Sequence, residues 1–332
     1  MIAGIVVAVI GACAFAAASV LQALGAEQVS QRAAVREERR RSARAHPSLR
    51  STVATMLTQA FLIGFVFDAI GFAATIAASR MIPLFLSQTI ISARLLATAL
   101  LALIVLKVGL LLRDWLAGAL TVAALILLAV AAGPQGAEHP GWMRWTTLAA
   151  GPVLFGVGLL GMRLLHRHIA SATGLAAGAV FGVMAVASRV VDGLAPFHLT
   201  TLFTDPALYA LVISGIGGFY LLTVALQTGS VNGAAAALVV GQTVLPGAVG
   251  IVFLGDATRA GWGPAAIVAF VAAVIGGVLL AMSGAVTAVE KAEAANAPTG
   301  FGHPAKPPAG HPQIAAPEGA MPKNPTHTDD SL

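Results

Sequence analysis

Residues 120–132 read LTVAALILLAVAA, and residues 100–106 shortly before them read LLALIVL. Neither stretch alternates apolar and polar side chains at period two, as the strands of a membrane β-barrel do. Apolar side chains instead point in every direction around such a segment. An apolar run of about 20 residues crosses a hydrocarbon core of roughly 30 Å as a helix, with all its backbone hydrogen bonds satisfied internally. The two stretches therefore predict membrane-spanning α-helices.

The same kind of run recurs along most of the chain. Hydrophobic residues make up 58% of the 332 residues and charged residues only 10%, which leaves too little polar surface for a water-soluble globule. We therefore predict an all-α membrane protein, in a lipid bilayer, with about nine transmembrane helices. The predicted spans are Ile2–Leu24, Gln59–Ser79, Pro83–Leu106, Trp115–Ala132, Trp145–Leu165, Ile169–Val190, Ala207–Gln227, Val231–Leu254 and Gly263–Ala285.

Basic residues are concentrated on one side of these predicted spans. Seven of the 19 lysines and arginines fall in Arg32–Arg50, and other loops on the same side also carry lysine or arginine. Such segments face the cytoplasm and attract anionic lipid headgroups, so the net charge of +5 does not indicate nucleic acid as a partner. We predict a multi-pass protein of the cell membrane with its N-terminus outside and its C-terminus in the cytoplasm.

The composition changes after residue 285. Eight prolines are spread from Pro298 to Pro325 among glycines, alanines and charged residues, which predicts a disordered tail. The predicted division of the chain is a first transmembrane helix (1–24), an Arg-rich cytoplasmic loop (25–58), the rest of a first repeat (59–133), a linking helix (134–168), a second repeat (169–285) and a disordered, Pro-rich cytoplasmic tail (286–332).

The two halves of the chain share landmarks. Gly71-Phe72 precedes a tight turn and the third span, and Gly218-Phe219 likewise precedes a turn at 228–230 and the eighth span. Each half then closes with a polar link and a span rich in glycine and alanine. Because one span joins the halves, the predicted repeat is inverted in the membrane, as four spans, one linking span and four spans. Such repeats build two similar gates around one site near the midplane.

Four segments that carry these landmarks resemble a known family. Residues 64–74, GFVFDAIGFAA, are similar to a second span in which a glutamate is followed by Asn-Phe-Ala-Ala, and Ile82-Pro83-Leu84 is similar to a Thr-Pro-Leu start of the third span. Residues 112–118 and 253–256, followed by Trp262, are similar to Leu-Gly-Glu links that precede each closing span. This pattern resembles the drug/metabolite transporter superfamily, and within it the NIPA-like magnesium-transporter branch.

The resemblance implies a carrier that works by alternating access, with a divalent cation such as Mg²⁺ as its solute. Three positions depart from the family pattern. Asp68 stands in place of the glutamate, Gly71 stands in place of the asparagine, and Arg94 is a basic residue within a span.

Polar and ionisable side chains within the spans are the candidates for a site. A charge at the bilayer centre costs roughly 3 kcal/mol, so Asp68 and Arg94 stand out. Both are 13 residues from Met81, at the turn between their spans, and we expect them to meet at the midplane, either as the functional centre or as a bridge that fixes two helices. Asp68 is also the candidate metal ligand. The other predicted pathway residues are Gln88, Thr89 and Ser92 in the third span and Gln242 and Thr243 in the eighth.

Motifs of catalysis do not occur in the chain. There is no nucleophile elbow, phosphate-binding loop or metal-spaced His/Cys cluster, so we predict neither an enzyme nor a cofactor. We predict a transporter of a small polar solute or ion. The alternative is a membrane assembly or lipid-handling protein, in which Arg32–Arg50 binds anionic lipid or a partner. The sequence does not indicate the oligomeric state.

Overall fold

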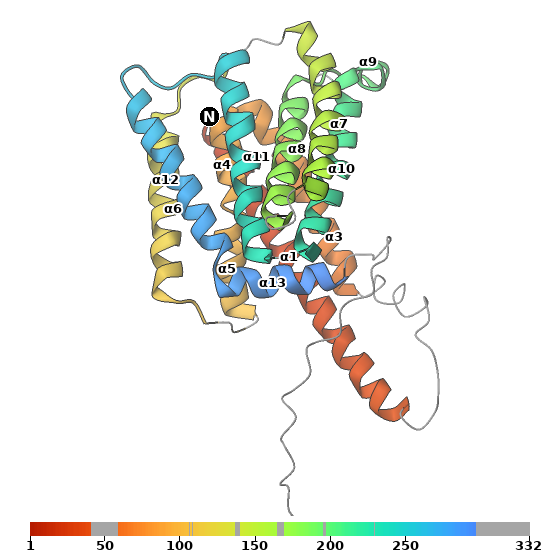
Figure 1. Cartoon of the computed structure of the whole chain (residues 1–332). Coiled ribbons are helices and arrows are strands. Elements are labelled where there is room, and N and C mark those ends of the chain that lie inside the picture. Colours follow the sequence, from red (N-terminus) through yellow and green to blue (C-terminus); the bar gives the residue numbers. More distant parts are fainter. Residues whose placement is uncertain are drawn as a thin grey trace, which may run out of the picture. The chain divides into compact units, whose positions relative to one another are not determined.

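The computed structural model describes residues 1–40, 59–105, 107, 109–136, 140–164, 169–194, 197–228 and 230–296. These residues form an α-helical bundle that includes nine helices long and apolar enough to cross a membrane (Figure 1). The prediction of an all-α, multi-pass membrane protein is thereby confirmed for the described part of the chain. Residues 41–58 of the predicted Arg-rich loop and residues 297–332 of the predicted tail lie outside the described residues.

The helices divide between the two halves of the chain. Those before residue 165 are α1 (Ile2–Arg40), α3 (Gln59–Met81), α4 (Leu84–Ser92), α5 (Arg94–Val105), α6 (Leu112–Ala131) and α7 (Gly141–Leu164). Those after it are α8 (Ile169–Val190), α9 (Leu199–Thr204), α10 (Pro206–Thr228), α11 (Val231–Phe253), α12 (Gly263–Ala281) and α13 (Gly284–Asn296). α4 and α5 together form one span, which is broken at Ala93.

The bundle has two ends, which the charge bias of the loops predicts to face opposite sides of the membrane. The end that holds residues 133–136 and the α11–α12 link is named the outer end, because our predicted orientation places it outside the cell. The end that holds the α5–α6 link and α13 is named the inner end (Figure 1).

Helix pairs within and between the halves make up the bundle. α1 packs along α3, and α8 packs along α10 and α11. α4 packs against α11 and α6 against α12, so these two pairs join the first half of the chain to the second. α7, the predicted linking helix, packs against α8 and α10.

Glycines bring α8 and α11 into backbone contact. A Cβ atom added at Gly178 of α8 would lie 2.3 Å from the carbonyl oxygen of Leu238, and one added at Gly241 of α11 would lie 2.5 Å from the carbonyl oxygen of Leu175. Small residues allow this kind of close approach, which is a common way for membrane helices to pack. The backbones of α8 and α11 are therefore in direct contact in the second half of the chain.

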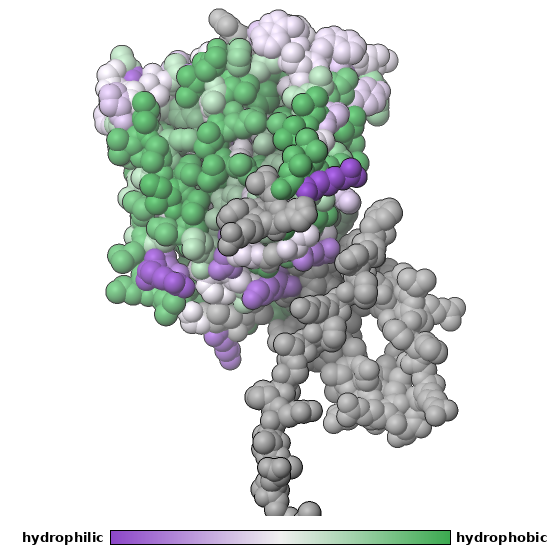
Figure 2. All heavy atoms as spheres, viewed as in Figure 1, coloured by the Kyte–Doolittle hydropathy of each residue, from purple (hydrophilic) through white to green (hydrophobic). Residues whose placement is uncertain are grey.

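Large apolar side chains cover much of the surface. Ile104, Ile216 and Val252 are 72%, 69% and 68% exposed. Figure 2 shows an apolar band across the helices, with hydrophilic side chains near the inner end. A water-soluble protein rarely exposes a contiguous apolar surface larger than a few hundred Å², so this band is the surface that faces lipid.

Helical structure extends past two predicted boundaries. α1 continues to Arg40, beyond the predicted end of the first span at Leu24. α13 occupies residues 284–296, so the structure differs from the disordered tail predicted from residue 286 onward. The reason is that Val289 is fully buried among residues of α1 and α5, and Val286 is fully buried among residues that include those of α5 and α11. Apolar burial of this kind offsets the entropy lost when the segment is ordered.

Candidate functional site

The predicted pathway residues of the third and eighth spans lie in two helices that pack against each other. The α4 residues are Gln88, Thr89 and Ser92, and the α11 residues are Gln242 and Thr243, all of them buried. The amide nitrogen Nε2 of Gln242 donates a hydrogen bond of 2.9 Å to the hydroxyl Oγ of Ser92. The structure thus places the predicted pathway residues of α4 next to those of α11, where the first half of the chain packs against the second.

The hydroxyl groups of this cluster are satisfied locally. Ser92, Thr89 and Thr243 each donate a hydrogen bond to the backbone carbonyl four residues earlier in their own helix. Serine and threonine commonly bond to the backbone in this way in membrane helices. The hydroxyls of Thr89 and Thr243 are therefore explained by helix structure alone.

The terminal amide of Gln88 has no such explanation. The side chain is only 4% exposed, and its nitrogen Nε2 has no hydrogen-bond partner. Leaving a buried polar group unpaired costs about 1–3 kcal/mol, so almost all such groups in folded proteins have partners. Gln88 is therefore a buried, unpaired donor four residues before Ser92, on the helix that packs against α11.

Helix α11 supplies a further polar group at this level. Pro246 lies inside α11 and has no N–H, so the carbonyl of Gln242, four residues earlier, lacks its usual helical donor. At the next position, a Cβ atom added to Gly247 would lie 3.3 Å from Cβ of Phe85, which shows how closely α4 approaches here. Interrupted membrane helices with freed carbonyls are typical of solute and ion sites in transporters.

Asp68 bonds to α1 rather than to Arg94. Nε2 of Gln22 donates a hydrogen bond of 2.6 Å to Oδ2 of Asp68, whereas the guanidinium of Arg94 lies 5.5 Å from the ring centroid of Phe15. Gln22 and Phe15 are seven residues apart in α1, or about 10 Å along the helix axis. Within the described residues, no ion pair joins Asp68 to Arg94, so the contact expected from equal depth is not formed.

The ring of Phe15 in α1 lies against both Gly71 and Arg94. A Cβ atom added at Gly71 would lie 2.9 Å from the ring of Phe15, so an asparagine at this position would displace the ring. The same ring receives the guanidinium of Arg94 in a cation–π contact. Gly71 and Arg94 therefore belong to one local arrangement, in which the glycine makes room for the aromatic ring that holds the arginine.

The outer end is held by a buried ion pair that was not predicted as part of a site. Nη2 of Arg189, in the last turn of α8, lies 3.0 Å from Oδ1 of Asp256 in the α11–α12 link, and the two side chains are 1% and 0% exposed. The guanidinium of Arg189 also donates to the backbone carbonyls of Ser79 (2.7 Å), Ile82 (3.1 Å) and Gly136 (2.8 Å). We name Arg189, Asp256 and these partners the outer network.

Asp256 ties the first helix residue of α4 into the outer network. Its Oδ2 accepts a hydrogen bond of 2.7 Å from the backbone N–H of Leu84, and its Oδ1 accepts one of 3.0 Å from the N–H of Gly136. A carboxylate at a helix N-terminus is stabilised by the unpaired N–H groups and the helix dipole. A Cβ atom added at Gly136 would lie 1.7 Å from the carbonyl oxygen of Leu254, so only glycine fits at this position.

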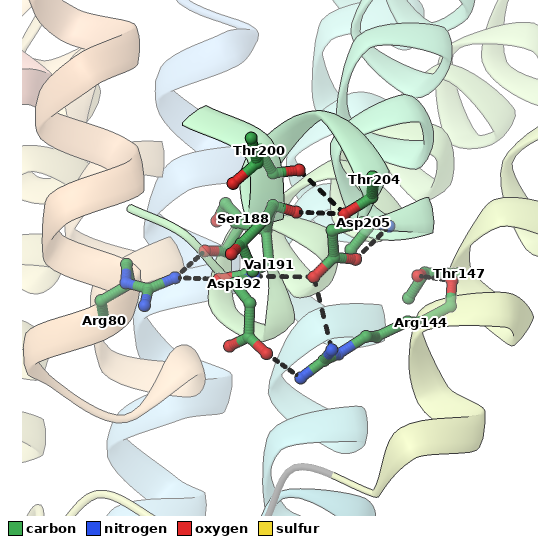
Figure 3. Close-up of polar contacts among 11 residues, drawn as sticks. Arg80, Arg144, Thr147, Ser188, Val191, Asp192, Thr200, Thr204 and Asp205 are labelled. Atoms are coloured by element: carbon green, nitrogen blue, oxygen red, sulfur yellow. Dashed lines mark hydrogen bonds and ion pairs between the residues drawn. The ribbon is translucent and has the colours of Figure 1, made fainter. Parts of the chain in front are cut away.

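Further charged contacts cross the outer end (Figure 3). Nη1 of Arg80, in α3, donates a hydrogen bond of 2.6 Å to the carbonyl of Val191, just after α8. Arg144 of α7 pairs with Asp192, and its Nη1 lies 3.5 Å from Oδ2 of Asp205. Together with the outer network, these contacts join α3 and α4 of the first half to α7, α8 and the α11–α12 link.

The sequence held a signal for the outer network that loop charges alone do not reveal. Arg189 lies at the end of an apolar span, and Asp256 lies in the polar link before the last span. A charge at the end of an apolar helix needs a partner once it is buried, and few acidic residues are predicted on the same side as Arg189. Matching the sparse charges of one side with each other would have identified Asp192, Asp205 and Asp256 as its possible partners.

No group of three or more His, Cys, Asp or Glu side chains that could hold a metal ion occurs in the described ranges, and Asp68, the candidate metal ligand, has Gln22 as its hydrogen-bond partner. The chain matches no protein-family model, no curated protein and no solved structure.

Proposed function

We propose that the chain is a transporter that moves a small polar solute across the membrane by alternating access. The observation that carries the proposal is the buried terminal amide of Gln88, whose nitrogen has no hydrogen-bond partner. A polar group with a purely structural role is normally paired, because an unpaired one lowers stability. A solute with a hydrogen-bond acceptor would give this amide its partner during transport.

The different character of the two ends supports alternating access. The outer end is held by the buried Arg189–Asp256 pair and its backbone contacts. Nearer the inner end, Asp68 and Arg94 are only half-buried. A carrier closes one end of its route while the other end gives access to the site. We interpret the structure as a state that is closed at the outer end.

Helix packing supports the inverted repeat on which this mechanism depends. If spans one to four correspond to spans six to nine, the α1–α3 pair corresponds to the α8–α10 pair, and both are tightly packed. The same correspondence makes α4 and α11 counterparts, as it does α6 and α12, and each of these pairs is in contact. Counterpart helices meet near the axis of an inverted repeat, where transporters bind their solutes. Gln88, Ser92 and Gln242 lie at one such meeting.

The charges near the site favour one class of solute. A divalent cation prefers several carboxylate oxygens, whereas Asp68 is a single carboxylate and the cationic Arg94 lies in the same part of the bundle. A guanidinium recognises carboxylate and phosphate groups well. We therefore favour a small solute with an anionic group over a bare cation such as Mg²⁺, which the family resemblance implies, and we assign to Asp68 the coupling of transport to protons.

The test is a Gln88→Leu variant of the purified protein. Leucine removes the unpaired amide, so the melting temperature should stay the same or rise, while uptake into proteoliposomes should fall at least tenfold. Sugar phosphates, dicarboxylates, nucleobases, amines and divalent cations are screened by thermal shift, because a ligand that binds the folded state stabilises it.

A matched control for this test is Thr121→Val in α6. Thr121 is also buried, and it donates to the carbonyl of Ala117 in its own helix. The control variant should keep both uptake and the thermal shift. If the Gln88→Leu protein is stabilised by the same compounds as the wild type and to the same extent, Gln88 is not part of the solute site.

The alternative function, in membrane assembly or lipid handling, rests on Arg32–Arg50. Residues 41–50 of this segment lie outside the described residues, so its interaction with anionic lipid stays a prediction from the sequence.

A further inference from the structure

An apolar groove opens between α5, α6 and α12 on the side of the bundle. Its volume is about 460 Å³, within the range of roughly 300–1,000 Å³ typical of small-molecule sites. It is lined by Leu96 and Leu100 of α5, Ala119, Ala123 and Ile126 of α6, and Leu280 of α12. None of these six residues belongs to the candidate solute site or to the outer network.

The groove faces lipid, and its length along α6 is close to the thickness of one leaflet. Ile126 is 61% exposed and Leu100 is 36% exposed, on the apolar surface of the bundle. Along α6 the lining runs from Asp114 to Ile126, which is twelve residues or roughly 18 Å of helix. Half of a 30 Å hydrocarbon core is about 15 Å. A single acyl chain of one leaflet therefore matches the groove in length.

The groove reaches the inner end of the bundle, where the chain around the α5–α6 link carries two basic residues. Lys107 and Arg113 lie in or next to the α5–α6 link, and the side chain of Arg113 is 68% exposed. Asp114 lines the mouth, but its Oδ2 accepts a hydrogen bond of 3.0 Å from the N–H of Leu111, and Nε of Arg113 lies 3.6 Å from its Oδ1. Trp115, which also lines the groove, is 52% exposed, as is usual for tryptophan at the headgroup level.

We propose that this groove binds one phospholipid with an anionic headgroup. One acyl chain lies along Ala119 and Ala123, and the phosphate lies at the mouth beside Lys107 and Arg113. The two cations and Asp114 leave one net positive charge there. A basic residue near an anionic membrane surface contributes about fivefold to binding, so we expect about that preference for an anionic over a zwitterionic headgroup. This site is separate from the Arg32–Arg50 segment.

The experiment measures retained lipid on the purified full chain by native mass spectrometry and by thermal shift. The probes are palmitoyl-oleoyl phosphatidylglycerol and phosphatidylcholine with the same acyl chains. Ala119→Phe with Ala123→Phe fills the groove without replacing a buried side chain and should abolish retention of both lipids. Lys107→Gln with Arg113→Gln should leave retention in place and remove the fivefold preference.

The matched control is Ala69→Phe with Ala73→Phe, two exposed alanines four residues apart on α3. It should retain lipid as the wild type does. Equal loss of lipid from the control and the groove variant would show an ordinary lipid annulus and overturn the site. Unchanged retention by the groove variant would also overturn it, and equal retention of the two lipids by the wild type would overturn the anionic headgroup.

Discussion

The guanidinium of Arg189 is surrounded by four acceptors, which are the carboxylate of Asp256 and three backbone carbonyls. Charges are seldom buried to this degree unless they are both paired and hydrogen-bonded, because transfer out of water costs several kcal/mol per ion. Backbone carbonyls from two other segments, 79–82 and residue 136, complete the shell. The stability of the pair therefore depends on the closed arrangement of the whole outer end.

Breaking the buried Arg189–Asp256 ion pair should lower the stability of the protein far more than breaking an exposed ion pair. We expect Asp256→Asn to destabilise the protein by about 3–5 kcal/mol, since it leaves the charge of Arg189 buried without its partner. The matched control is Asp192→Asn, whose side chain is 50% exposed in its pair with Arg144 and should contribute about 0–1 kcal/mol. The melting temperatures of the two variants and the wild type, measured in the same detergent, test this expectation. Equal shifts for the two variants would contradict the role given to the outer network.

A substitution at Asp68 should affect transport without affecting stability. Asp68→Asn keeps an oxygen that can accept the hydrogen bond from Gln22, so the melting temperature should change little, because Asp68 has no ion pair to lose within the described part of the chain. Uptake should fall at least tenfold if Asp68 carries the coupling proton. The exchange Asp68→Arg with Arg94→Asp is the further check: an exchanged protein that is stable and fully active in uptake would remove both residues from the proposed mechanism.

At the scale of helices, backbone contacts between α8 and α11 limit which substitutions the second half of the chain tolerates. Gly178→Ala adds a Cβ atom that would lie 2.3 Å from the carbonyl of Leu238. The α8–α11 pair must then separate, at an expected cost of about 1–3 kcal/mol. Gly156→Ala in α7 is the control, since an added Cβ there meets nothing within 4 Å, and it should be neutral or slightly stabilising. Thermal unfolding of both variants tests this, and a more damaging Gly156→Ala would refute it.

Helix α13 changes where the dispensable tail should begin. Removing residues 298–332 should leave folding and insertion unchanged. Removing residues 284–332 also takes away the buried side chains of Val286 and Val289, and each is expected to contribute about 1.5–3 kcal/mol. Accumulation in the membrane and the melting temperature distinguish the two truncations. If the longer truncation is as stable as the shorter one, α13 does not support the bundle.

The elements differ in how far the sequence predicts them. The spans were predictable because twenty apolar residues in lipid have few structural options. The break at Ala93 was not predictable in this way, because no proline or glycine marks it in the sequence. Val286 and Val289 lie about one helical turn apart, but the prolines that follow favour disorder when the sequence is considered alone. The sequence predicts that Ser92 and Gln242 both line a solute pathway, but it does not predict the hydrogen bond between them. The two residues are 150 positions apart, so their pairing depends on the tertiary structure.

For the whole molecule, the orientation remains a prediction that cysteine labelling can test. Cys13 is the one native cysteine, so a Cys13→Ser background is needed. A cysteine at Ala260, exposed in the α11–α12 link, should react with an impermeant maleimide in intact cells. A cysteine at Ser42, in the Arg-rich segment outside the described residues, should react only after permeabilisation. The opposite pattern would invert the predicted topology.

The outer network also sets an order of events during synthesis. Leu84 and Asp256 are 172 residues apart in the chain, and a ribosome adds about 5–20 residues per second. The N-terminus of α4 therefore enters the membrane on the order of ten seconds or more before its carboxylate partner exists. Until then the first four spans cannot adopt their final arrangement at that end. The first half of the chain therefore stays incompletely assembled at its outer end until the second half has been synthesised.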